Sequence, residues 1–136
     1  MIAAAVAIKV QFYDLDPMQV VWHGSYVRFL EQARCALLDA IGYNYVEMKE
    51  SGYLWPVVEL HVKYVRAIQF GQEISVEARL AEYENRLRIT YRITDAASGA
   101  VLTKATTTQV AVDGATSEML FESPAVLREK VRSLLP

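Results

Sequence analysis

An alternation of apolar and polar side chains with a period of two runs through much of the chain between residues 58 and 112 and constrains the fold more than any other feature. The apolar positions of the first three runs are Val58, Leu60, Val62 and Tyr64, then Ile74, Val76, Ala78 and Leu80, then Leu87, Ile89, Tyr91 and Ile93. A fourth run extends from Ala100 to Val112, and short turns such as Ser98-Gly99 separate the runs. This pattern predicts antiparallel strands with one polar face. The segment Ile8 to Tyr13 alternates as well, and Ile2 to Ile8 reads as a frayed first strand.

Helical spacing is confined to a few segments. Apolar residues recur at three and four positions from Ser25 to Ile41, with Ser25 as the expected cap, and Gly42 is expected to end this helix. Asp16-Pro17-Met18-Gln19 predicts a short helix capped by Asp16. A further turn or two is expected around Tyr45 to Ser51, and an amphipathic helix from Ser123 to Leu135. The sequence thus predicts a single α+β domain over residues 1–136, in which one long helix covers an antiparallel sheet of five or six strands.

Composition excludes several classes of function. Fourteen basic residues against 16 acidic ones give a net charge of −2, which argues against nucleic acid as a partner. Neither G-x-S-x-G nor G-x-G-x-x-G occurs, so a serine hydrolase and a dinucleotide enzyme are poor candidates. One cysteine and two histidines exclude an internal disulfide and predict no metal site, and we expect a reducing, cytoplasmic location. The apolar opening is too short for a membrane span.

The stretch from Tyr13 to Arg34 carries the most specific motif. It contains Asp14 and Asp16, the run Val20-Val21-Trp22-His23, then Tyr26, Glu31, Ala33 and Arg34. This arrangement resembles the signature of the hotdog-fold acyl-CoA thioesterases, in the branch of 4-hydroxybenzoyl-CoA thioesterase and its YbgC-like relatives. Gln19 departs from that signature, which usually has glycine or a small residue there, and Ala67 replaces a common proline.

The resemblance implies a curved sheet wrapped around the long helix, and hydrolysis of a thioester between an acyl group and coenzyme A or an acyl-carrier protein. Asp16 would be the catalytic carboxylate, either as nucleophile or as general base, and a backbone amide near His23 would polarise the carbonyl. The substrate would lie between two subunits of a homodimer or homotetramer, and no cofactor would be needed. Substrate-binding candidates are Val21, Trp22, His23 and Tyr26 from the motif, and Trp55, Val58, Glu59 and Leu60 from the strand expected near the partner's cleft.

The chemistry of a thioester is compatible with such a small site. Its thiolate leaves without strong acid help, so an ionised carboxylate and donors for the developing oxyanion suffice. A helix start beside Asp16 would favour the carboxylate form.

Simpler roles compete for most of these residues. Asp16 alone would be read as a helix cap. We expect Asp14 to anchor a loop, His23 to position or bind, and Cys35 to be a buried core thiol. Glu31 and Arg34 could pair across one helical turn. The phosphates of coenzyme A have several candidate partners that the sequence does not separate: Arg66, Arg86, Arg88, Arg92, Lys104 and Arg128.

Two alternatives to a thioesterase remain. A non-catalytic module that binds acyl thioesters would keep the cleft but would not need a carboxylate at Asp16. A hotdog dehydratase would use a histidine in a different context from His23-Gly24-Ser25-Tyr26.

Overall fold

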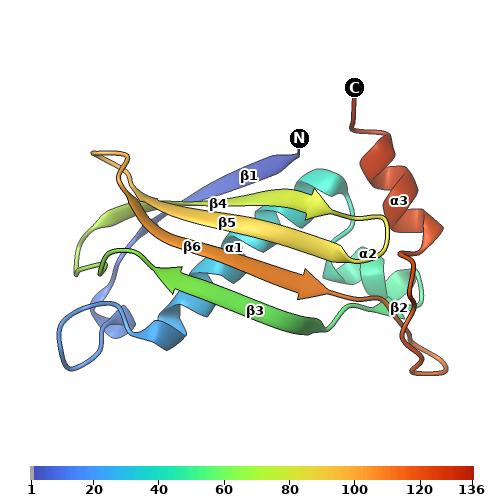
Figure 1. The fold of residues 1–136 in the computed structure, drawn as a ribbon, viewed down its shortest axis with the longest axis horizontal. Coiled ribbons are helices and arrows are strands. Elements are labelled where there is room, and N and C mark those ends of the chain that lie inside the picture. Colours follow the sequence, from blue (N-terminus) through green and yellow to red (C-terminus); the bar gives the residue numbers. More distant parts are fainter. Residues whose placement is uncertain (1) are drawn as a thin grey trace.

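The computed structural model describes residues 2–136 and contains the antiparallel sheet that the alternation predicts (Figure 1). Its order is β1-β4-β5-β6-β3. The strands are β1 (Ala3–Lys9), β3 (Val57–Tyr64), β4 (Glu73–Glu82), β5 (Leu87–Asp95) and β6 (Val101–Gln109). Two short strands, β2 (Tyr53–Leu54) and β7 (Val112–Asp113), pair apart from it. The prediction of an α+β fold with an antiparallel sheet of five or six strands is confirmed, and the sheet has five.

One long helix, α1 (His23–Ile41), crosses one face of the sheet, as Figure 1 shows. Its inward side buries Phe29, Leu30, Ala33, Leu37 and Leu38, which are all at most 3% exposed. These side chains belong to the same core as the inward residues of β4 and β5. The inward residues are every second residue of each strand, as the alternation predicts, and Val76, Ala78, Ile89 and Ile93 are fully buried. The helix ends at Gly42, as predicted, since the chain turns there with φ 80°, a conformation that costs glycine little.

Two shorter helices complete the fold. The helix α2 (Tyr45–Glu50) confirms the expected turns after Gly42, and Asn44 caps it by accepting a hydrogen bond from the Tyr45 N–H. The C-terminal helix α3 (Ala125–Arg132) is shorter at both ends than the predicted Ser123 to Leu135 and follows Pro124. None of the helices in residues 2–136 is long and apolar enough to cross a membrane.

The first strand and the segment after it differ from the prediction. The strand β1 pairs with β4 over its full length rather than fraying, and it stops at Lys9. Phe12 and Tyr13, predicted as strand, lie instead in a single 3₁₀ turn, Phe12–Asp14. That turn forms because the Asp14 carboxylate accepts a hydrogen bond from the Gln11 N–H at 2.8 Å.

The predicted short helix at Asp16–Gln19 is wrong. The Asp16 carboxylate accepts a hydrogen bond from the Met18 N–H at 2.8 Å, which forms an Asx turn, and the chain then reverses through Gln19 at φ 64°. Ser25 is not the cap of α1 either, because the helix starts at His23 and the Ser25 hydroxyl donates to the Asp14 carbonyl at 3.0 Å. Both residues were predicted as helix caps, but their side chains bond to the loop backbone instead.

Two side chains of α1 also differ from the expectation. Arg34 does not pair with Glu31; its guanidinium is buried and donates to the Tyr45 hydroxyl at 2.9 Å. Cys35 is only half-buried and lies in a groove beside Val6 of β1, so it is not a core thiol.

Candidate active site

The residues between Asp14 and Trp22 form a loop whose two ends are hydrogen-bonded to each other. The Asp16 N–H donates to the Val20 carbonyl at 2.9 Å, and the Trp22 N–H donates to the Asp14 carbonyl at 2.9 Å. The Val21 N–H donates to the Ile68 carbonyl at 2.7 Å, which ties the loop to the segment after β3. These bonds place Asp16 beside the start of α1.

Asp14 holds this loop in place. Its side chain is 5% exposed, and it accepts from the Gln11 N–H and from the Arg28 guanidinium at 3.0 Å. The prediction that Asp14 anchors the loop is confirmed by this geometry. The two aspartates of the D-x-D pair therefore differ in environment: Asp14 is buried and bound to Gln11 and Arg28, whereas Asp16 is half-buried and its carboxylate accepts only the local bond from the Met18 N–H in residues 2–136.

A hollow of about 240 Å³ lies between this loop, the start of α1 and the end of β3. It is lined by Asp16, Val20, Val21, His23, Tyr26, Tyr64 and Ala67. Four of these, Asp16, Val21, His23 and Tyr26, are residues that the sequence singled out. Because the hollow combines one carboxylate with apolar and aromatic walls, it suits a small apolar group joined to a polar reacting centre.

The wall opposite the loop is aromatic. The rings of Tyr26 and Tyr64 meet edge to face at 4.8 Å between centroids. Burial raises the pKa of the Tyr26 phenol, and the neighbouring Tyr64 raises it further. The phenol is therefore neutral around pH 7 and can donate a hydrogen bond.

The start of α1 supplies backbone donors to the same region. In residues 2–136, the N–H groups of His23 and Gly24 have no acceptor, whereas that of Ser25 donates to the Trp22 carbonyl. Free amides at a helix start carry partial positive charge and favour an anion nearby. They are suitable donors to a carbonyl oxygen that becomes negative during a reaction.

Trp22 covers the helix start from outside. Its ring centroid lies 5.1 Å from that of His23, and the residue is 49% exposed. The ring also lies against Gly24, where a Cβ atom would overlap it. Glycine at this position therefore lets Trp22 fold over the first turn of α1. Trp22 does not line the hollow within one chain.

The second group of sequence candidates lies elsewhere in the chain. Trp55 is buried, with its indole N–H donating to the Tyr43 hydroxyl at 3.2 Å and its carbonyl accepting from Gln109 at 2.7 Å. Val58, Glu59 and Leu60 are exposed on β3, which is an edge strand of the sheet and runs away from the Asp16 loop towards its Val57 end (Figure 1). A single chain does not bring these four residues to the hollow.

Sequence reasoning missed Val20, Tyr64 and Ala67 as lining residues. Val20 lies inside the motif, but its position in the wall of the hollow depends on the β-bridge between Val20 and Gln69, which are far apart in the sequence. Tyr64 was read only as the last apolar residue of a strand. No spacing rule connects it to Asp16, because the contact depends on where β3 ends relative to α1.

Metal ligands are not grouped in the structure. In the part of the chain that it describes, residues 2–136, no three His, Cys, Asp or Glu side chains are close enough to hold a metal ion.

A family model described as "Thioesterase-like superfamily" matches residues 10–132. Among curated proteins, "Putative esterase sll0410" of Synechocystis sp. is 32% identical over 130 residues, covering 95% of this chain and 78% of the relative. "Putative acyl-CoA thioesterase YneP" of Bacillus subtilis is 30% identical over 107 residues, covering 78% and 77%.

Solved structures share the fold. A DHNA-CoA thioesterase from Staphylococcus aureus has a TM-score of 0.83 and 25% identity, covering 98% of this chain and 93% of its own. A 4-hydroxybenzoyl CoA thioesterase variant solved with 4-hydroxybenzoyl CoA has a TM-score of 0.81 over 96% of this chain and 99% of its own, with 17% identity. The second likeness is one of fold alone.

Proposed function

The chain belongs to the Thioesterase-like superfamily with the hotdog fold, and from this premise we propose that it hydrolyses acyl-CoA or acyl-carrier-protein thioesters with Asp16 as the catalytic carboxylate. The observation that carries the proposal is the hollow in which Asp16 lies between the free amides of the α1 start and the Tyr26–Tyr64 wall. No other carboxylate lines this hollow in residues 2–136.

The proposed reaction begins with the thioester carbonyl oxygen accepting hydrogen bonds from the His23 and Gly24 N–H groups. Acting as a general base, Asp16 takes a proton from water while the water oxygen bonds to the carbonyl carbon. Acting as a nucleophile, its carboxylate would instead bond to that carbon first, and water would then hydrolyse the resulting anhydride. In both routes the carbon–sulfur bond breaks, the acid forms, and the thiolate leaves and takes up a proton.

The magnitudes are adequate for an enzyme without further groups. A positioned base contributes about 10² to 10⁴ in rate, and one oxyanion donor contributes about 3 kcal/mol. Binding in the hollow adds the gain from holding the reactants together. Val21 and Tyr26 would contact the acyl group or the pantetheine arm, and His23 would position it.

We further propose that the active unit is at least a homodimer formed along β3. This edge strand carries exposed apolar side chains on its inner face, with Val58 at 56%, Leu60 at 44% and Tyr64 at 51% exposure. Unpaired edges of this kind are normally covered, and an antiparallel pairing of two β3 strands would bring Val58, Glu59 and Leu60 of the partner subunit towards the Tyr64 end, where Asp16 lies. Trp22 would then lie in the interface, and Trp55 would hold the start of β3 from within.

The test is release of free thiol from a panel of short, medium, long-chain and aryl acyl-CoAs and of acylated carrier protein, with a chelator present. Asp16→Asn should keep the fold and the oligomer size but lower kcat by at least about 10², since the amide neither attacks nor takes a proton. Cys35→Ala is the matched control and should keep most of its turnover, because Cys35 lies in a separate groove.

Three outcomes would contradict the proposal. An active Asp16→Asn enzyme would refute the role of Asp16. A stable, correctly assembled but inactive Cys35→Ala variant would mean that the nucleophile was wrongly chosen. Binding of the acyl thioesters without thiol release from any of them would favour the non-catalytic binding module.

A further inference from the structure

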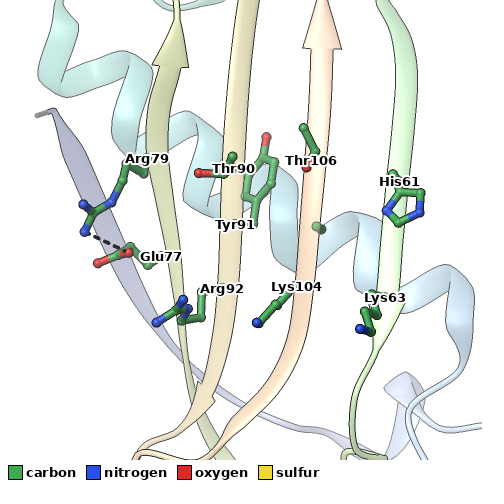
Figure 2. A pocket seen from close by; sticks show the side chains of 10 residues that line it. His61, Lys63, Glu77, Arg79, Thr90, Tyr91, Arg92, Lys104 and Thr106 are labelled. Atoms are coloured by element: carbon green, nitrogen blue, oxygen red, sulfur yellow. Dashed lines mark hydrogen bonds and ion pairs between the residues drawn. The ribbon is translucent and has the colours of Figure 1, made fainter.

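The face of the sheet opposite α1 carries a second hollow, of about 530 Å³, which the thioesterase proposal does not use (Figure 2). It lies over β3, β4, β5 and β6. Strand register defines two rows of side chains in it. The first row is Lys63, Lys104, Arg92 and Glu77, and the second is His61, Thr106, Thr90 and Arg79.

The first row places three cations directly opposite one another on neighbouring strands. Lys63 is paired in register with Lys104, and Lys104 with Arg92, and all three side chains are exposed. Adjacent strands lie about 4.8 Å apart, and like charges directly opposite each other destabilise a sheet. Figure 2 shows the three side chains in line on three adjacent strands.

Acidic groups nearby do not neutralise this row. Glu77 is next to Arg92 in register, but its carboxylate already accepts from Arg79 at 3.4 Å. Glu59 on β3 and Glu82 on β4 lie in a third row, with Thr108 and Arg88 between them. This third row is two rows away from the three cations. Among residues 2–136, no ion pair involves Lys63, Lys104 or Arg92. The fold therefore maintains three uncompensated cations in one hollow.

We propose that this hollow binds a small organic diphosphate, with Lys63, Lys104 and Arg92 holding the phosphate oxygens. Two or more adjacent anionic groups match three cations at strand spacing, whereas a single carboxylate would leave most of the charge unbalanced. The Thr90 and Thr106 hydroxyls in the neighbouring row are further donors to phosphate. Guanidinium and ammonium groups are the usual partners of phosphate in proteins.

The dimensions favour a small molecule over a macromolecule. A hollow of this volume is within the range of small-ligand sites. The positive row spans only three strands, about 10 Å at the usual strand spacing, and Glu77 limits it on the β4 side. A polynucleotide needs a longer basic surface.

This site is separate from the candidate active site. Tyr64, which lines the Asp16 hollow, directly follows Lys63 on β3, and consecutive strand residues point to opposite faces of a sheet. The sheet itself therefore stands between the two hollows. A diphosphate bound on the outer face is not the reacting thioester, so the proposal stands independently of the thioesterase activity.

Isothermal titration calorimetry at low salt tests the proposal, with inorganic pyrophosphate and ADP as the probes. The wild type should bind both, with ADP at least as tight as pyrophosphate. Lys104→Gln should raise both dissociation constants at least tenfold, because it removes the central cation of the row. Lys49→Gln on α2 removes one charge from a distant exposed position and should change them less than twofold.

Thermal unfolding without ligand gives a second readout that a disrupted fold could not imitate. In low-salt buffer without ligand, Lys104→Gln should unfold at a higher temperature than the wild type, because repulsion within the row is relieved. Added pyrophosphate should raise the unfolding temperatures of the wild type and of Lys49→Gln by similar amounts, and that of Lys104→Gln by less. The proposal fails if the wild type binds neither probe, if it binds pyrophosphate but not ADP, or if Lys104→Gln binds as tightly as Lys49→Gln.

Discussion

Replacing Asp14 by alanine should destabilise the protein far more than replacing Asp16, although the two carboxylates are two residues apart. Asp14→Ala removes the acceptor of the Gln11 N–H at 2.8 Å and the partner of Arg28 at 3.0 Å, from a side chain that is 5% exposed. A hydrogen bond to a charged group contributes about 1.5–3 kcal/mol. Arg28 is 58% exposed, so its ion pair adds less than about 1 kcal/mol. The expected loss is about 2–3 kcal/mol.

Asp16→Asn, by contrast, keeps an oxygen that can accept from the Met18 N–H, so its cost should be below about 0.5 kcal/mol. For a chain of this length, 1 kcal/mol corresponds to roughly 4 °C in unfolding temperature, so Asp14→Ala should unfold about 8–12 °C lower. Thermal and urea unfolding followed by circular dichroism, at one fixed protein concentration, measure the unfolding temperatures and the free energies of both variants.

Arg28→Ala is the control that separates the two contributions to the Asp14 effect. It removes the exposed ion pair and the hydrogen bond from the Arg28 guanidinium to the Ser25 hydroxyl at 3.1 Å, but it keeps the bond from the Gln11 N–H to Asp14, and it should cost about 1 kcal/mol. If Asp14→Ala and Asp16→Asn unfolded at urea midpoints that could not be told apart, the argument that one carboxylate anchors the loop and the other is free would be refuted.

Two further predictions concern the Asp16 loop and the acid stability of the sheet. Gln19 has φ 64°, a conformation that glycine adopts easily, so Gln19→Gly should leave the free energy of unfolding unchanged or raise it by up to about 1 kcal/mol. Gln19→Val introduces a β-branched side chain there and should lower the free energy of unfolding by about 1 kcal/mol. A Val variant more stable than the Gly variant in urea would contradict this. Hydrogen bonds from the Gln72 side chain and from the Ser98 N–H and hydroxyl lower the pKa of Asp95. The Asp95 carboxylate should therefore stabilise the fold fully above the ordinary aspartate pKa of about 3.9, and this stabilisation should be lost as the pH falls through the lower pKa of the folded state. Urea midpoints of the wild type and Asp95→Asn should therefore converge from pH 7 towards pH 3, and a gap that widened with acid would show that the sign is wrong.

The sequence by itself determined the main elements and the family. Period-two alternation determined β3, β4, β5 and β6, because a sheet with one buried face needs an apolar side chain at every second residue. The three-and-four spacing determined the inward side of α1, and Gly42 determined its end, since both depend on neighbours within a turn or two. The motif from Tyr13 to Arg34 was specific enough to indicate a hotdog thioesterase, and the family match confirms it.

Only the tertiary structure decided the loop that carries Asp16. The Asp-Pro signal was interpreted as a helix start, whereas bonds from Trp22 to Asp14 and from Val21 to Ile68 hold these residues in a reversing turn. The bond from Val21 to Ile68 joins segments that are distant in sequence, and the bond from Trp22 to Asp14 closes a loop longer than one helical turn, so no local propensity predicts either of them.

The makeup of both hollows was also decided by tertiary structure. Tyr64 reaches Asp16 because β3 ends beside the start of α1, and Lys63, Lys104 and Arg92 form a row because three strands are paired in one register. Alternation fixes which face a side chain takes, but it leaves open which residue of the next strand stands opposite. The physical reason is that register is set by the packing and hydrogen bonding of whole strands against one another.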